Sequence, residues 1–466
     1  MKRYLIVTIL FCIQSLAYGE TVDEKLDRLE NELLDLKLGR ADTTFLKVSG
    51  DFRTVYLSKE NEDVNDRDSN KNQTVSEFRI NLDSDSDSKV KFYSTLAATY
   101  FWNNNFQSPN VKVLDNTNKV QGVDMRVQKA YLDYFLNDKK ISLSLGRLPT
   151  QYGPPTHFSA NTGRQGTYPL LLYSVPLDGV ALTANLGKLF DAENRYIFRL
   201  IFSPFNNASG ISSIETVGSE GPFNEIESEG GSVFMANLET SGELSLGGNY
   251  AFILQGYSAK FGRAKALSGV RGVLQSQLPS GSIDRNVYEV GSEDENIATI
   301  NAAIAYFELT NFGDSKFDLY GSYKQTHVES EGSFTAVVVE DNTGGAFGPA
   351  GTEINIGGFL YDENEKGESI NLGTRYKFNS SFNVGIEYLK QTKGDAPFGV
   401  NTFNFSDLPI TIGTGYRFYT NYKIEPNLNL GLGYEIANTE NSFNGQKYMD
   451  VESKTKTLFT SLRYSF

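Results

Sequence analysis

Residues 456–466, KTLFTSLRYSF, end the chain and alternate between apolar and polar positions. Successive side chains of a β-strand point to opposite faces, so Leu458, Leu462, Tyr464 and Phe466 would share one face. At about 3.3 Å per residue the segment is long enough to cross a lipid bilayer as a tilted strand. The same pattern could end an ordinary soluble β domain, and the rest of the sequence must distinguish the two.

The N-terminus indicates export. Lys2 and Arg3 precede an apolar stretch over residues 4–13, and small residues at Ala17 and Gly19 follow, which predicts a signal peptide over residues 1–19. Cys12 follows Phe11 rather than a small residue, so no lipid anchor is expected. Because it is the only cysteine, the mature chain should have no disulfide and no cysteine-ligated metal.

The composition is compatible with a membrane-spanning β-barrel. No later run of about 18 apolar residues predicts a transmembrane helix, and the mean hydropathy is −0.35. A barrel, however, carries its lipid face in every second residue, and its typical marks are present here as 13% aromatic residues and 43 glycines. The net charge of −14 argues against a nucleic-acid partner and suits acidic exposed loops.

The predicted fold class is all-β, a transmembrane antiparallel β-barrel over residues 45–466. Alternating segments occur at 45–58, 74–83, 88–101, 123–136, 140–148, 178–187, 194–203, 231–242, 246–258, 298–310, 316–328, 368–378, 381–391, 410–420, 427–438 and 456–466. Short links alternate with links of about fourteen residues or more, as periplasmic turns alternate with external loops in such barrels. About 16 strands are therefore expected, with 18 as the alternative. Counting the run at 353–361 as a further strand would make the number of strands odd, so we place it in a loop.

One segment before the barrel has the periodicity of a helix. Val22, Leu26, Leu29, Leu33 and Leu36 are spaced four, three, four and three residues apart, which is a heptad seam. A helix over residues 20–40 needs a cover for this stripe, since so short a helix is marginal alone. It could pack on the barrel rim, but the unbroken seam favours a short periplasmic coiled coil that joins copies of the chain. A homotrimer is the expected assembly.

The third long connection, near residues 147–177, is expected to narrow the barrel. It holds five of the thirteen prolines, and proline fixes φ, so the loop should adopt one conformation. If it bends inward, Arg147, His157 and Arg164 are the candidate constriction residues. The alternative is an external loop that caps a neighbouring subunit.

Alternation also predicts which charged side chains face the lumen. The basic ones are Arg53, Arg79, Lys129, Arg199, Lys324, Arg375, Arg417 and Arg463. The acidic ones are Asp51, Glu77, Asp133, Asp318, Glu387 and Glu435. The small cationic excess suggests a weak preference for anions, although pairing across strands or a slip of register would remove it.

Neither histidine lies in a catalytic motif, so we expect no enzyme activity, no cofactor and no metal site. His157 and His327 are far apart in the sequence, and no motif for a serine nucleophile accompanies them.

The segments KAYLDYFLNDKKISLSLGRLPTQYGPP at 129–155 and GRQGTYPLLLYSVPLDGVALTANL at 163–186 carry a family resemblance. They resemble a family of uncharacterised Gram-negative outer-membrane proteins defined by a domain of unknown function. The overall layout is similar to that of trimeric porins with an N-terminal coiled coil. The last residues also resemble the C-terminal signature read by the barrel-assembly machinery. The resemblance implies location in the outer membrane of a Gram-negative bacterium.

The favoured function is therefore passive diffusion of small hydrophilic solutes through an outer-membrane porin. Its other expected partners are outer-membrane lipid and the barrel-assembly machinery. Phosphate selectivity is not supported, because the third loop supplies few arginines and lysines. The alternative function is that of a structural or surface-interaction, adhesin-like barrel without an open channel.

Overall fold

The fold is seen in a computed structural model. It describes residues 45–63, 69–85, 89–102, 123–164, 166–174, 176–192, 194–205, 231–261, 287–290, 298–330, 335–340, 353–355, 364–395, 411–443 and 448–466. The expected signal peptide and the seam helix at 20–40 lie outside these ranges. Residues 47–83 and 88–466 form one compact unit, which contains the barrel.

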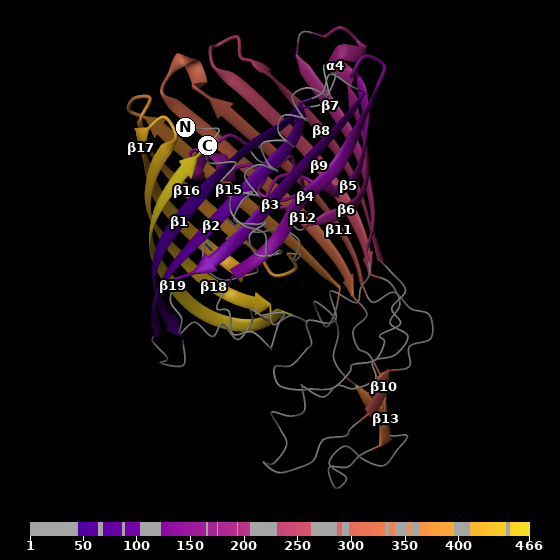
Figure 1. The fold of residues 1–466 in the computed structure, drawn as a ribbon. Coiled ribbons are helices and arrows are strands. Elements are labelled where there is room, and N and C mark those ends of the chain that lie inside the picture. Colours follow the sequence, from indigo (N-terminus) through magenta and orange to yellow (C-terminus); the bar gives the residue numbers. More distant parts are fainter. Residues whose placement is uncertain are drawn as a thin grey trace, which may run out of the picture. The chain divides into compact units, whose positions relative to one another are not determined.

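Sixteen antiparallel strands close into a barrel, as predicted (Figure 1). In chain order they are β1 (Phe45–Asp63), β2 (Ser69–Asp85), β3 (Val90–Phe101), β4 (Val123–Leu136), β5 (Ile141–Leu148), β6 (Leu177–Asn185), β7 (Arg195–Phe205), β8 (Gly231–Glu243), β9 (Asn249–Phe261), β11 (Ala298–Thr310), β12 (Phe317–Ser330), β15 (Glu365–Lys377), β16 (Phe382–Gln391), β17 (Thr411–Glu425), β18 (Leu428–Phe443) and β19 (Tyr448–Ser465). Each strand pairs with its neighbours in the sequence of barrel strands.

The last strand closes the barrel against the first. Thr54 of β1 lies opposite Leu462 of β19, and the pairing continues to Asp63 opposite Ser453. Beyond β19, the backbone N–H groups of Gly50 and Phe466 donate to each other's carbonyl oxygens, both at 2.9 Å. Closure removes the unpaired strand edges that lipid would not tolerate.

The strands at this seam are longer than the sequence predicted. We expected about fifteen residues between the first two strands, but β1 reaches Asp63 and β2 starts at Ser69. Likewise β18 and β19 are separated by residues 444–447 alone. The pairing of β1 with β19 continues beyond the apolar residues of both strands through polar side chains. Lys456 forms an ion pair with Glu62, and the Thr455 hydroxyl donates to Asn61. The expected link lengths were therefore wrong at these two places.

The remaining described elements are short. Strands β10 (Val287–Val290), β13 (Thr335–Glu340) and β14 (Glu353–Asn355) form a separate three-stranded sheet, so residues 353–355, the described part of the run at 353–361, do not belong to the barrel wall. The helices are α3 (Thr156–Ala160), α4 (Leu186–Leu189) and the 3₁₀ turn η2 (Phe312–Asp314). Among the residues described here, no helix is long and apolar enough to cross a membrane.

Alternation along the strands separates an apolar outer face from a mixed inner face. On β18, Leu432 and Tyr434 are exposed, whereas Gly431, Gly433 and Glu435 are buried. Near the turns between strands, aromatic rings form a girdle: Phe317 lies 4.7 Å from Tyr376, and Phe378 lies 5.2 Å from Phe382, measured between ring centroids. Such an outer face suits contact with lipid.

Candidate functional site

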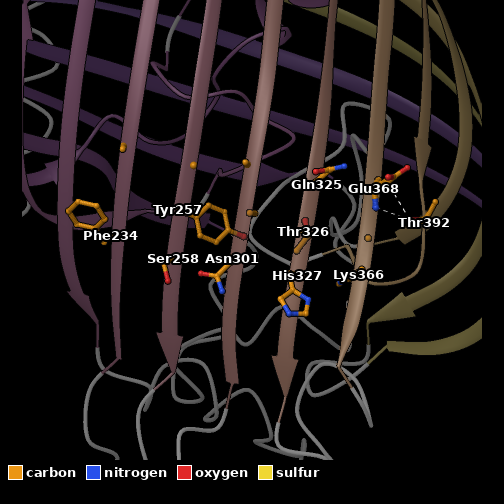
Figure 2. A pocket seen from close by; sticks show the side chains of 15 residues that line it. Phe234, Tyr257, Ser258, Asn301, Gln325, Thr326, His327, Lys366, Glu368 and Thr392 are labelled. Atoms are coloured by element: carbon orange, nitrogen blue, oxygen red, sulfur yellow. Dashed lines mark hydrogen bonds between the residues drawn. The ribbon is translucent and has the colours of Figure 1, made fainter.

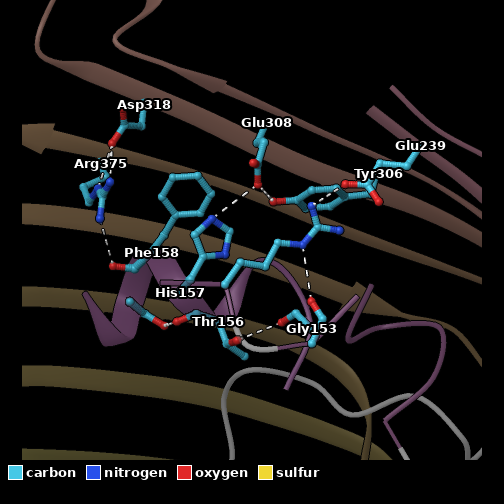
Figure 3. Close-up of polar contacts among 12 residues, drawn as sticks. Gly153, Thr156, His157, Phe158, Glu239, Tyr306, Glu308, Asp318 and Arg375 are labelled. Atoms are coloured by element: carbon cyan, nitrogen blue, oxygen red, sulfur yellow. Dashed lines mark hydrogen bonds and ion pairs between the residues drawn. The ribbon is translucent and has the colours of Figure 1, made fainter. Parts of the chain in front are cut away.

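The third long connection folds into the barrel. It leaves β5 at Leu148, which is 1% exposed, and its side chains and carbonyl groups contact inner-face residues of β8, β11, β12, β15 and β17. Its helix α3 follows Pro155, and the Thr156 hydroxyl donates to the carbonyl of Gly153 at 2.7 Å (Figure 3). Helix α3 ends at Ala160 and is followed by Asn161, which has a left-handed φ of 50° that asparagine tolerates better than most residues do.

Phe158 anchors the helix to the wall. Its ring stacks on Tyr320 of β12, with centroids 4.3 Å apart and planes inclined by 4°. The Arg375 guanidinium lies 4.9 Å from the Phe158 ring and is itself bound to Asp318. Tyr320 can lie flat along the wall because its β15 neighbour is Gly373, where an added Cβ would come within 2.2 Å of the Tyr320 ring. A glycine in the neighbouring strand thus makes room for the aromatic anchor.

Two side chains of the loop, His157 and Arg164, bind carboxylates of the wall. His157 Nε2 lies 3.3 Å from Glu308 Oε2, and the Tyr306 hydroxyl donates to the same oxygen at 2.7 Å (Figure 3). Arg164 donates to Glu239 Oε1 at 3.1 Å, while Arg199 binds the other oxygen at 2.8 Å. The loop is therefore tied to β8 and β11 through charged groups.

An apolar seat holds the later part of the loop. Leu170, Leu171, Leu172 and Tyr173 are at most 4% exposed. Leu171, Leu172 and Tyr173 belong with inward apolar side chains of the wall, such as Ile201, Met235, Ile300 and Ile304, to one buried region. Each fully buried leucine stabilises this arrangement by roughly 1.5–3 kcal/mol. Burial also raises the pKa of Tyr168 to about 12, so its hydroxyl stays neutral.

Lys324 links the apolar seat to the wall. Its ammonium group donates to the Leu171 carbonyl at 2.8 Å and forms an ion pair with Asp395. Asp395 also accepts from Ser369 at 2.6 Å and from Gln391 at 2.8 Å. The charges are almost fully buried, with side chains 1% and 2% exposed.

Across the lumen, the wall carries a row of arginines. This arginine row consists of Arg463 on β19, Arg53 on β1, Arg79 on β2 and Arg126 on β4. Asp51 accepts from Arg79 at 2.8 Å, and Glu77 lies 3.4 Å from Arg126. Tyr152 of the loop reaches this side too, because its hydroxyl accepts from Arg126 at 3.0 Å.

The structure places all eight predicted wall cations on the inner face. Arg417 illustrates the pattern, since it is 2% exposed and binds Glu435 and Glu387. It also reaches the loop, where it donates to the Ser159 hydroxyl at 3.3 Å. Lys129 shares its face with Tyr131 and Asp133, the latter accepting from Ser144.

Arg147 does not belong to this interior. Its guanidinium binds Asp178 through two bonds of 2.8 Å, and the Asp178 side chain is 60% exposed. Leu143 and Leu145 lie on the same face of β5 as Arg147, and both are exposed on the outer side of the barrel. The prediction that Arg147 lines the constriction was therefore wrong, because β5 is still a regular strand at this position.

Several inner-face residues were missed from the sequence. Arg126 is one, because a bulge in the β3–β4 pairing between Thr95 and Leu96 reverses the parity of β4 upstream of Lys129. The alternation of Met125 and Val127 with polar neighbours could have revealed it. Glu239 and Glu308 were missed too, since their partners Arg164 and His157 lie in a distant loop. Asp395 was missed because its partner Lys324 lies on β12, far from it in the sequence.

Two hollows accompany these contacts. One of about 400 Å³ lies beside Arg164 and is lined by polar groups of β8, β9 and β11, including Glu239 and Glu308. Another hollow, of about 1030 Å³, is lined by Phe234, Ser258 and Asn301 among others (Figure 2). These side chains point away from the inner face of the barrel, so this hollow is a groove on the outer face. In the described ranges, no group of three or more His, Cys, Asp or Glu side chains could hold a metal ion.

The chain matches one family and several solved barrels. The family described as "Protein of unknown function (DUF3373)" matches residues 67–449. No curated protein matches the chain. Solved structures that are similar to it include OmpT of Vibrio cholerae, an outer membrane protein folded in vitro, at 12% identity over 92% of this chain and 99% of that one, with a TM-score of 0.45. The anion-selective porin from Comamonas acidovorans is 10% identical over 91% and 100%, with a TM-score of 0.48. OprB of Pseudomonas putida is 12% identical over 94% and 96%, with a TM-score of 0.47.

Proposed function

The chain belongs to the DUF3373 family of proteins of unknown function, and we propose that it is an outer-membrane porin for passive diffusion of small hydrophilic solutes. The observation that carries the proposal is a closed barrel of sixteen strands with an apolar outer face and a charged inner face. Eight strands leave an interior that side chains just fill, whereas about sixteen leave room for an aqueous channel.

The inward loop would set the width and the selectivity of this channel. It is tied to β8 and β11 by contacts of Arg164 and His157 with wall carboxylates and to β12 by Phe158 and Lys324, so it would form a fixed constriction rather than a moving gate. The polar hollow beside Arg164 is the candidate route for solutes. The arginine row on the opposite wall favours anions, because cations within a low-dielectric wall focus the field.

The assembly is proposed from the sequence. The heptad seam at residues 20–40 would join three copies in the periplasm, and Phe466 with its strand would guide insertion by the barrel-assembly machinery. The signal peptide and the apolar outer face together support location in the outer membrane, with lipid around the barrel.

A structural or surface-interaction barrel without an open channel is the second candidate. It is favoured by the deep burial of inner charges, since Glu387 is 0% exposed and Lys324 is 1% exposed. An interior that is filled throughout would conduct no ions.

Conductance of the purified full-length protein in planar lipid bilayers separates these two functions. Stepwise openings in potassium chloride, with a reversal potential shifted toward that of chloride in a salt gradient, are expected for the porin. A bilayer that stays silent while gels show folded, heat-modifiable protein would overturn the porin proposal. A cation-selective current would overturn the anion preference alone.

A further inference from the structure

Four residues that line the hollow beside Arg164 form one row across the inner wall. Arg195 of β7 lies opposite Ser241 of β8, and Ser241 lies opposite Ala251 of β9. Ala251 in turn lies opposite Glu308 of β11. Directly opposed residues of antiparallel strands share one face of the sheet, so the four side chains are on the inner face together. The row therefore starts with a cation and ends with a carboxylate.

The middle of this row is open. Ser241 and Ala251 have short side chains, and the hollow above them measures about 400 Å³, a size that holds a small ligand. Neighbouring strands lie about 4.8 Å apart, so the backbones of Arg195 and Glu308 are separated by about 14 Å along the wall. The two side chains form no ion pair with each other. A molecule that carries a charge at each end fits between them.

Both ends of the row have groups to offer a ligand. Arg195 is exposed to the interior of the barrel and makes no hydrogen bond or ion pair with the residues that the structure describes. In the Glu308 carboxylate, His157 and the Tyr306 hydroxyl both contact Oε2 (Figure 3). Within the described part of the chain, the other oxygen, Oε1, is left for a ligand.

The remaining charges of the hollow differ from these two groups. Glu239 is already neutralised, because Arg164 binds its Oε1 and Arg199 binds its Oε2. Glu243 of β8 adds a second exposed carboxylate, one row closer to the strand end, where it lies opposite Asn249 of β9. The hollow thus presents a cation on the β7 side and carboxylates on the other strands.

We propose that this hollow binds a small zwitterion of the size of a dipeptide, with its carboxylate on Arg195 and its ammonium group on Glu308. A guanidinium group binds a carboxylate through two parallel hydrogen bonds, and a carboxylate attracts an ammonium group. An anion alone would be repelled by Glu308 and Glu243, and a cation alone would be repelled by Arg195. As a solute site the proposal rests on the porin function proposed above, whereas the binding itself does not require an open channel.

Saturation-transfer NMR on the full-length protein in detergent tests this site near pH 7. The probe is glycylglycine, and the comparison peptides are N-acetylglycylglycine, which has only the carboxylate, and glycylglycine amide, which has only the ammonium group. We expect saturable binding of glycylglycine to the wild type and binding at least five-fold weaker for each comparison peptide. Arg195→Gln should weaken glycylglycine at least five-fold, because the carboxylate loses its partner. The matched control is Arg147→Gln, which removes the same charge from the outer wall and should bind like the wild type.

No binding of glycylglycine to the wild type would overturn the site, as would equal binding to the wild type and to Arg195→Gln. Comparison peptides that bind as tightly as glycylglycine would also overturn it, because the hollow would then not recognise both charges. If Arg195→Gln fails to fold, Ser241→Leu takes its place, since it fills the middle of the row without changing a charge and should also weaken binding at least five-fold. Conductance separates the two proposals: a silent bilayer with bound glycylglycine removes the porin alone, and an open channel without binding removes the site alone.

Discussion

At the residue scale, Lys324 has a structural role that its own sequence position does not reveal. Alternation placed it on the inner face, but the reason for its burial lies in Leu171 and Asp395, which are distant along the chain. A buried ion pair is weak support for stability by itself, since two charges must be desolvated. Here the pair is completed by hydrogen bonds from Ser369 and Gln391 to Asp395, and by the loop carbonyl.

Replacing Lys324 by methionine should therefore destabilise the barrel by about 3–5 kcal/mol, because it leaves the Asp395 carboxylate buried without its cation. The temperature at which the folded species disappears on gels of unboiled samples measures the effect. The double variant Lys324→Met with Asp395→Asn should recover part of the loss.

The matched control for this pair is Arg147→Met, which breaks the partly exposed pair with Asp178 and should cost about 0–1 kcal/mol. If both methionine variants lower the transition temperature equally, the buried pair has no special role in holding the loop.

At the element scale, the C-terminal strand closes the barrel and ends in residues that resemble an assembly signature. The Phe466 ring stacks against Phe78 of β2 at a centroid distance of 6.0 Å, and an added Cβ at Gly50 would come within 2.7 Å of it. The glycine thus leaves space for the terminal ring on the outer face. A charge in the middle of the lipid face costs about 2–4 kcal/mol, but near the rim only about 0–1 kcal/mol.

Replacing Phe466 by aspartate should consequently impair assembly far more than stability or conductance. The yield of folded protein in the outer membrane is expected to fall at least several-fold, while the molecules that do assemble keep the wild-type transition temperature. Asn427→Asp adds the same charge at the exposed turn between β17 and β18 and is the control. Normal yield of the Phe466 variant would show that its match to the assembly signature is a coincidence.

At the scale of the whole molecule, the barrel was predictable from two patterns. Apolar and polar residues alternate within each strand, and the links between strands give an even number of strands. The bounds of β4 and β11 agree with the predicted 123–136 and 298–310 to the residue. The interior was predictable only in part. Alternation placed Arg375 and Arg417 on the inner face, yet it could not pair them with Phe158 and Ser159, since contacts between wall and loop leave no period in the sequence.

The proposed trimer depends on the heptad seam expected at residues 20–40, and a paired substitution can test this seam. Leu29→Ser with Leu33→Ser removes two seam positions, whereas Leu34→Ser with Leu38→Ser removes two leucines outside the seam. If the seam joins three copies, the first pair should lower the temperature at which the oligomer dissociates and leave barrel unfolding unchanged, because a/d side chains supply most of a coiled coil's contacts. The second pair should change neither. Size-exclusion chromatography with light scattering measures the mass of each species, and equal oligomer stability in both variants would show that the seam packs elsewhere.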